Sequence, residues 1–458
     1  MADINTQVIS ERFLKNDKNQ TNMQKYASRI KIAEGIRKEA HREPLNLEVK
    51  TALSTCLENT RQICEATQSS HIPSKTFFMD MVASVIPNTI APEIVSIQAM
   101  DAKAGMISYL RFVYGDKKGK AAAGQMFNNS LYHGQSVADY SASTISDEPL
   151  VAGAGATLSF YPVIPGTVRI KNANFAVTAV DDGSGKLFAP TDTTKATELG
   201  TIDYATGVIS TLNIEDETVV DYEYDNETAP VKVPQINLEL AQVPIFAKSR
   251  KLAAYWGFDA AYDLKKQYGE EVSSLMAVQA AGEIAYEIDT EIVMDLYNQA
   301  GAGADLVWSK TAPHGVSLVD HYDSFWAKLV EGDAAIFGAT QRFSPNFICC
   351  GINVLAVMQV MRNFSGDGAG NGVGPHFAGT LGGKYKVYVV PAMGANDFVM
   401  GYKGTNFLET GYVYAPYMPV LSTDLLTLAN MTGQQGYATS YGKKMVNNKL
   451  YIKGHIVD

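Results

Sequence analysis

The chain has 458 residues, of which 46% are hydrophobic and 19% charged, and a formal net charge of −10. These values exclude a disordered or fibrous protein, and the length predicts two to four lobes instead of one compact core. The sequence lacks both an apolar stretch of ~20 residues for crossing a bilayer and an N-terminal secretion signal, so we expect a soluble protein made in a cytoplasm, without a membrane partner.

The negative charge is concentrated in one segment. Residues 181–227 carry twelve Asp and Glu against two Lys, whereas residues 1–50 carry ten Lys and Arg against seven Asp and Glu. The remainder is near neutral, so the net charge of the whole chain does not by itself exclude contact with nucleic acid.

The N-terminal third predicts helices, then strands, then a loop. Apolar residues at helical spacing predict a helix over residues 46–66, and a second over residues 74–85 that ends before a proline. Residues 94–114 predict β structure with a turn at 101–105. Glycine, alanine and serine dominate residues 119–155, which predict a long mobile loop.

A small all-β insert is predicted next, over residues 157–228. Apolar and polar residues alternate at 168–171 and 220–225, as in strands with one solvated face. Turn-forming residues at 182–183 and 205–207 separate the strands.

A long helical pattern follows over residues 258–300, with Gly269 breaking it into two pieces. The second piece, residues 270–298, would be about 40 Å long. A helix of this length needs a sheet or other helices along it for support.

The last third alternates strands and helices. We predict a buried strand over residues 347–350, a helix over 352–362, a glycine-rich surface loop over 366–374, a strand over 384–390 and a C-terminal strand over 445–456.

No pattern of an active site is present, so we predict no catalytic residue, no cofactor and no bound metal. The glycine-rich loop fits neither GxGxxG nor GxxxxGK[ST], and the sequence has no GxSxG and no HExxH. The seven histidines are scattered. Four cysteines, Cys56, Cys64, Cys349 and Cys350, lack metal-ligand spacing and are expected to be buried free thiols.

Four short passages, in this order, resemble the major capsid proteins of T-even-type tailed phages. They are IPNTIAPEIVSIQAM at residues 86–100, AKSRKL at 247–252, LGGKYKVY at 381–388 and YAPYMP at 414–419. Each passage is short, but their shared order makes coincidence a poor explanation.

The resemblance implies an α+β protein with the Hong Kong-97 type capsid fold, in which the helix at 270–298 is the long spine helix. Its parts would be an N-terminal arm (1–75), the start of the peripheral domain (76–104), an extended loop (105–245) carrying the all-β insertion domain (157–228), the peripheral domain with the spine helix (246–309), an axial domain (310–440) and a C-terminal strand (441–458).

The implied function is a structural one without enzymatic activity: self-assembly into an icosahedral or prolate head shell that encloses double-stranded DNA. The partners would be further copies in hexamers and pentamers, the vertex, portal and scaffold proteins, and decoration proteins. Packaged DNA would touch the inner surface without sequence preference, with the basic arm inside and the acidic insert outside. The location is the virion, and the host cytoplasm during assembly.

Relatives of this kind often lose an N-terminal propeptide by cleavage after Glu in an I/L-x-E sequence. Two matches are present, which end at Glu34 and at Glu65.

Three alternatives remain at this point. Two share the fold: a pentameric vertex protein and an encapsulin-like compartment protein. The third, a surface adhesin or decoration protein, is suggested by the β insert and disfavoured by the long spine helix and the missing export signal.

Overall fold

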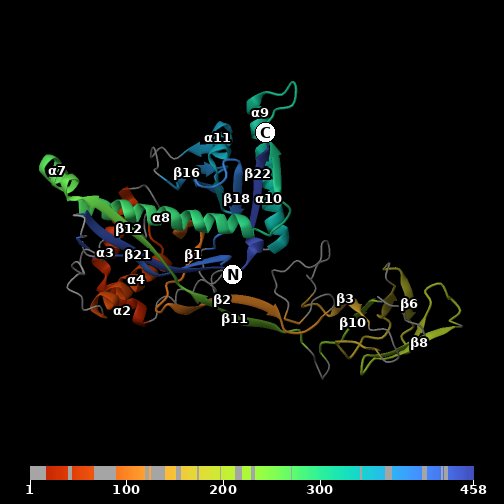
Figure 1. Cartoon of the computed structure of the whole chain (residues 1–458). Helices are drawn as coiled ribbons and strands as arrows, with labels where there is room; N and C mark the ends of the chain where they lie inside the picture. The colour runs from red at the N-terminus through yellow and green to blue at the C-terminus, as the bar shows by residue number, and fades with distance from the viewer. Residues whose placement is uncertain are drawn as a thin grey trace. The chain divides into compact units, whose positions relative to one another are not determined.

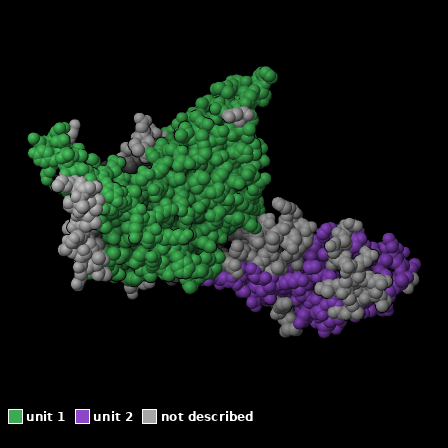
Figure 2. Space-filling view, viewed as in Figure 1, with its two compact units in different colours: residues 1–109, 241–458 green, residues 110–240 purple. Residues whose placement is uncertain are grey.

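The computed structural model is α+β and divides into two compact units (Figures 1 and 2). Unit 1 comprises residues 1–109 and 241–458, and unit 2 comprises residues 110–240. The chain enters unit 2 along β2 (Ala104–Tyr114) and leaves it along β11 (Ile236–Phe246), and these two strands pair. The structure describes residues 17–39, 44–66, 89–118, 123–124, 140–150, 156–172, 175–195, 197–211, 219–227, 233–269, 271–340, 343–366, 374–404, 410–423, 426–427 and 432–457.

Unit 1 begins with helices that contribute to its core. They are α2 (Asp17–Lys25), α3 (Ala27–Glu39), α4 (Leu47–Ala66) and the short α6 (Ala91–Ile94). The predicted helix over residues 46–66 is confirmed as α4, which buries Leu53 and Leu57 completely and packs against β19. The helix predicted over residues 74–85 and its proline stop lie outside the described residues.

The first sheet of unit 1 follows the order β1-β19-β21-β12, with β20 pairing to β21. Its strands are β1 (Ser96–Ile97), β12 (Lys248–Gly257), β19 (Tyr412–Ser422), β20 (Leu426–Thr427) and β21 (Thr432–Met445). β12 runs antiparallel to β21 for ten residues, from Lys248 opposite Tyr441 to Gly257 opposite Thr432.

The predicted break at Gly269 is confirmed. α7 (Phe258–Tyr268) ends at this glycine, whose φ of 72° is left-handed, and α8 (Val272–Gln299) starts after it. The 28 residues of α8 span about 42 Å at 1.5 Å per residue. Its buried stripe, which includes Ile284, Ile288 and Ile292, packs over the first sheet, which supplies the support that so long a helix needs (Figure 1).

The second sheet has the order β13-β22-β18-β14-β17-β16-β15. Its strands are β13 (Leu306–Ser309), β14 (Phe347–Cys350), β15 (Phe364–Gly366), β16 (His376–Leu381), β17 (Tyr385–Val389), β18 (Asp397–Gly401) and β22 (Tyr451–Val457). Three helices accompany it: α9 (Leu318–Asp323), α10 (Phe325–Thr340) and α11 (Ile352–Val360).

Most predictions for the last third are confirmed, with one correction. β14 is buried throughout, α11 covers most of the predicted helix, and β17 matches the strand predicted over 384–390. The C-terminal strand is wrong as one element: β21 ends at Met445, a 3-10 turn, η1 (Asn448–Leu450), intervenes, and β22 follows. The Asn447 side chain caps that turn by accepting a hydrogen bond from Lys449 N at 3.1 Å. Within the predicted loop at 366–374, only Gly366 and Gly374 lie among the described residues.

Unit 2 contains an eight-stranded sheet in the order β3-β10-β5-β6-β7-β8-β9-β4. Its strands are β3 (Thr144–Pro149), β4 (Ala156–Thr157), β5 (Arg169–Lys171), β6 (Val177–Asp181), β7 (Lys186–Phe188), β8 (Glu198–Asp203), β9 (Val208–Thr211) and β10 (Val219–Glu223). The predicted turns at 182–183 and 205–207 connect β6 to β7 and β8 to β9.

The prediction of a loop over residues 119–155 is wrong where β3 forms. β3 pairs antiparallel with β10 and buries Ile145 and Glu148. The buried Glu148 carboxylate accepts from Tyr222 Oη at 2.6 Å and from Ser159 N at 3.1 Å. A carboxylate at an inward position breaks the apolar alternation by which a strand is recognised in sequence.

Candidate functional site: the α6 hub and the exposed surfaces

Buried charged groups converge on α6, within the first sequence passage singled out above. We use the name α6 hub for residues 90–94, the side chains of Arg37, Asp289 and Lys403 that bind them, and Glu48 of α4, whose charge acts on Lys403. Asp289 of α8 is 2% exposed, and its carboxylate accepts hydrogen bonds from Ile90 N at 2.9 Å and Ala91 N at 3.1 Å. These bonds satisfy backbone donors at the start of α6 that its own carbonyls cannot reach.

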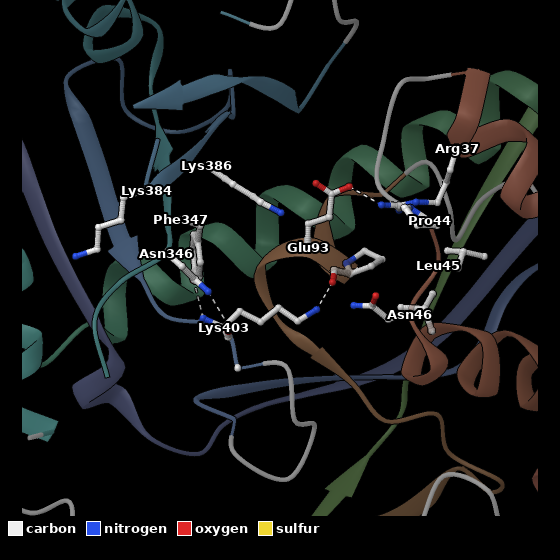
Figure 3. A pocket seen from close by; sticks show the side chains of 13 residues that line it. Arg37, Pro44, Leu45, Asn46, Glu93, Asn346, Phe347, Lys384, Lys386 and Lys403 are labelled. Atoms are coloured by element: carbon white, nitrogen blue, oxygen red, sulfur yellow. Dashed lines mark hydrogen bonds and ion pairs between the residues drawn. The ribbon is translucent and has the colours of Figure 1, made fainter. Parts of the chain in front are cut away.

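Two cations hold the other side of α6 (Figure 3). Arg37 of α3 pairs with Glu93 at 2.6 Å, and the guanidinium is buried. The Lys403 ammonium donates to the Pro92 carbonyl. Asn346 fixes the Lys403 backbone, because its amide exchanges two hydrogen bonds with Lys403 N and O, at 2.9 and 2.8 Å. Residues far apart in the sequence therefore meet at one turn of helix.

Burial perturbs two ionisable groups of the hub in opposite directions. Burial raises the pKa of Glu48, a shift that the nearby Lys403 charge opposes, and Ile97 N donates to the Glu48 carboxylate. Burial lowers the pKa of Lys403, opposed by the charges of Glu48 and Glu93. Each group is thus driven towards its neutral form by burial and towards its charged form by its partners.

The cavity beside the hub has a volume of about 210 Å³ and is lined by an ion network. Its charged lining residues are Arg37, Glu93, Lys384, Lys386 and Lys403. Arg37 is engaged by Glu93, and the Lys384 ammonium is bound to Asp333. This arrangement fastens α3 to the body of unit 1.

Residue types used in catalysis have structural roles in the described part of the chain. Cys56, Cys349 and Cys350 are buried free thiols, as predicted, and burial raises the pKa of Cys350 to about 12, so that it is a poor nucleophile. The Cys64 side chain lies outside the described residues. His321 Nε2 bonds Ser309 O at 2.8 Å, and the described residues contain no group of three or more potential metal ligands.

An apolar row lies exposed along β11. Ile236, Leu238 and Leu240 are 58%, 53% and 48% exposed and alternate along the strand, so they share one side, which we name the β11 face. A continuous exposed apolar row on a two-stranded ribbon is typical of a surface that another protein covers.

The two residues at which cleavage was considered lie in helices. Glu34 is on α3 and pairs with Lys50 at 2.6 Å. Glu65 is in the last turn of α4, pairs with Arg61, and is 42% exposed.

The roles of the hub side chains were not predicted from the sequence. Asp289 carried a signal, because it lies four residues after Ala285 and four before Val293, on the buried stripe of α8. Lys403 carried none, since it is a single charge in an ordinary pattern. Glu48 did carry one: it lies four residues before Ala52 and eight before Cys56, on the buried stripe of α4.

The exposed β11 face indicates a protein that binds other protein chains, as self-assembling structural proteins do. Within the described residues, no helix is long and apolar enough to span a membrane. The sequence model of the family "Major capsid protein Gp23" matches residues 74–458, and the chain belongs to this family.

Several curated relatives share this description. The chain is 27% identical over 394 residues to the major capsid protein of Enterobacteria phage T6, covering 80% of this chain and 76% of that one. It is 28% identical over 396 residues to that of Enterobacteria phage T4 (80% and 74%) and 25% identical over 400 residues to that of Vibrio phage KVP40 (80% and 74%).

Solved capsids are also similar. The capsid protein of Myoviridae phage XM1 matches with a TM-score of 0.34 and 9% identity, over 51% of this chain and 81% of that chain. The capsid structure of the cyanophage P-SCSP1u matches with a TM-score of 0.34 and 9% identity, over 52% of this chain and 80% of that chain.

The family confirms the resemblance seen in the sequence. The protein is a shell-forming major capsid protein of the virion, a structural role that implies no enzymatic activity. The vertex, encapsulin-like and adhesin alternatives are not favoured, because the relatives named above are major capsid proteins.

Proposed function

We propose that the chain has the Hong Kong-97 type subunit plan and assembles as hexamers and pentamers around enclosed double-stranded DNA. Family membership supports this plan, and so does the long α8 lying on a sheet. In the plan, α8 is the spine helix, β2 and β11 form the extended loop, residues 110–240 carry the insertion domain, and the second sheet belongs to the axial domain.

The observation that carries the proposal is the β11 face. Ile236, Leu238 and Leu240 expose about half of their surface each in the single chain. We propose that a neighbouring copy covers this face in a head-to-tail contact, which closes rings. Many such moderate contacts per subunit give a stable shell although none is tight alone.

Replacing Leu238 and Leu240 by Asp tests this contact. We expect soluble, folded subunits, because both side chains already face solvent, and the loss of closed shells in electron micrographs. Phe175→Asp is the matched control, since Phe175 is also in unit 2, is 53% exposed and lies outside the β11 face, and it is expected to leave assembly unchanged. Normal shells from the double variant would contradict the proposal.

The charge distribution supports an orientation in the shell. Unit 2 carries seventeen Asp and Glu against nine Lys and Arg, and acidic groups repel DNA. We propose that unit 2 faces outward, where decoration proteins bind, and that the basic N-terminal part faces the interior of the shell before it is cleaved. Vertex, portal and scaffold proteins would complete the head. A density map with unit 2 on the inner surface would overturn this orientation.

Between the two candidate cleavage positions, the structure favours Glu65. Glu34 lies within α3 and is paired across to α4, whereas Glu65 is at the end of α4 and exposed. We propose that a protease acting on the assembled shell cleaves after Glu65. N-terminal sequencing of mature particles is expected to begin at Ala66. A sequence beginning at residue 35, or an intact N-terminus, would exclude cleavage at this position.

A further inference from the structure

The helix α7 has no core of its own. Within residues 258–267 no side chain is buried, and among the described elements the helix packs against β12 and α8 (Figure 1). An isolated helix of 11 residues is marginal in water, and helices in proteins are stabilised mainly by packing an apolar face. The described part of the chain therefore leaves the apolar face of α7 uncovered.

That face is a stripe at a spacing of four residues. Phe258 and Tyr262 are 40% and 66% exposed, and Lys266 continues the stripe with its ammonium 5.6 Å from the centre of the Tyr262 ring. Residues four apart lie on one side of a helix, so this side reads aromatic, aromatic, cation.

The charges along α7 run from acidic to basic. Asp259 and Asp263 precede Lys265 and Lys266. Lys265 is paired with Glu271 at 3.3 Å, but both side chains are more than two-thirds exposed, so this pair contributes little and can exchange partners.

We propose that α7 pairs antiparallel with α7 of a second copy, around a two-fold axis that passes beside Tyr262. Reversal about residue 262 places Asp259 opposite Lys265 of the other copy, and Phe258 opposite its Lys266, a cation–π contact. The two Tyr262 rings then meet each other. The stripe is complementary to the same stripe running in the opposite direction. It therefore fits a second copy of the chain, because in an isologous contact both copies use the same patch.

The area buried between two α7 helices is small, so we expect this contact in assembled shells and not between free subunits. Two helices of this length bury far less than the ~800 Å² per partner of a stable complex, so dilute subunits remain unpaired. In a shell, the other contacts hold the two helices at high effective concentration. The inference rests on the shell-forming function and adds a second kind of contact, distinct from the β11 face.

Cysteine crosslinking in assembled shells tests the geometry. Facing positions on a packed helix pair, 8–10 Å between axes, bring their Cα atoms within the ~7 Å limit of a disulfide. Tyr262→Cys is expected to give covalent dimers on mild oxidation, since residue 262 meets itself. The single variants Phe258→Cys and Lys266→Cys are each expected to give no covalent dimer. A chain that carries both substitutions is expected to give covalent dimers. Phe175→Cys, equally exposed, and the native chain are the controls.

A charge exchange provides a second test that does not depend on cysteine. Lys265→Glu with Lys266→Glu makes α7 uniformly acidic and is expected to lower shell yield at least several-fold. Adding Asp259→Lys and Asp263→Lys to the same chain restores the complementarity and the yield. Two results would overturn the two-fold pair. One is intact shells of the Tyr262→Cys variant that form no covalent dimer. The other is a four-fold charge-exchanged chain that assembles no better than the Lys265→Glu, Lys266→Glu variant. Neither outcome affects shell formation by the native chain, on which the proposed function depends.

Discussion

Replacement of Asp289 by Ala is expected to lower the free energy of unfolding by about 3 kcal/mol. The carboxylate is buried and accepts two backbone hydrogen bonds, from Ile90 N and Ala91 N. Bonds to a charged acceptor contribute about 1.5–3 kcal/mol each, and the alanine leaves both donors unsatisfied in the interior. Urea unfolding of the unassembled chain, followed by circular dichroism, measures the shift.

Glu287→Ala is the matched control for this experiment. Glu287 lies on the same helix, and its side chain is 49% exposed in a pair with Arg250 at 3.5 Å. An exposed pair of this kind contributes about 0–1 kcal/mol. Equal shifts for the two variants would show that Asp289 does not stabilise the start of α6.

The hub gives a physical reason for the first sequence passage. Residues 90–94 are bound by the side chains of Asp289 from α8, Arg37 from α3 and Lys403, which follows β18. A short helix has free backbone N–H groups at its start and free carbonyls towards its end. The first can bind an acidic partner and the second a basic one. The family passage thus marks a junction that joins α3, α6, α8 and residue 403 within unit 1.

Elements with local signals were predictable from sequence. α4 and α8 have apolar residues at helical spacing, and Gly269 takes a left-handed conformation that glycine adopts without strain. β14 is a short apolar run buried on both faces. In each case the information lies within a few residues of the element itself.

Elements that depend on distant partners were not predictable. β21 contains Thr, Gly and Gln where strands usually have β-branched and aromatic residues, and it forms because β12 and β19 pair on both sides of it. Gly442 illustrates the constraint: a Cβ there would lie 2.7 Å from the Ile245 side chain. The hub is similar, since its charges come from segments up to 366 positions apart.

The hub also predicts that the losses of Arg37 and Glu48 are not additive, because both changes act on Lys403. Arg37→Ala leaves Glu93 without its 2.6 Å partner in a site that is largely buried. Breaking such a pair costs about 3–5 kcal/mol, and the nearby Lys403 charge places the expected cost at the lower end of this range.

In the double variant with Glu48→Gln, Lys403 no longer has a buried carboxylate on the α4 side, so its charge is available to Glu93. We therefore expect the double variant to be destabilised by at least 0.5 kcal/mol less than the sum of the single variants, measured in urea as a double-mutant cycle. Additive shifts would show that Lys403 does not exchange partners. The proposed cleavage after Glu65 would cut the covalent link between Arg37 and Glu48 on one side and Glu93 and Lys403 on the other, so that afterwards only packing and these charges hold α3 and α4 in place.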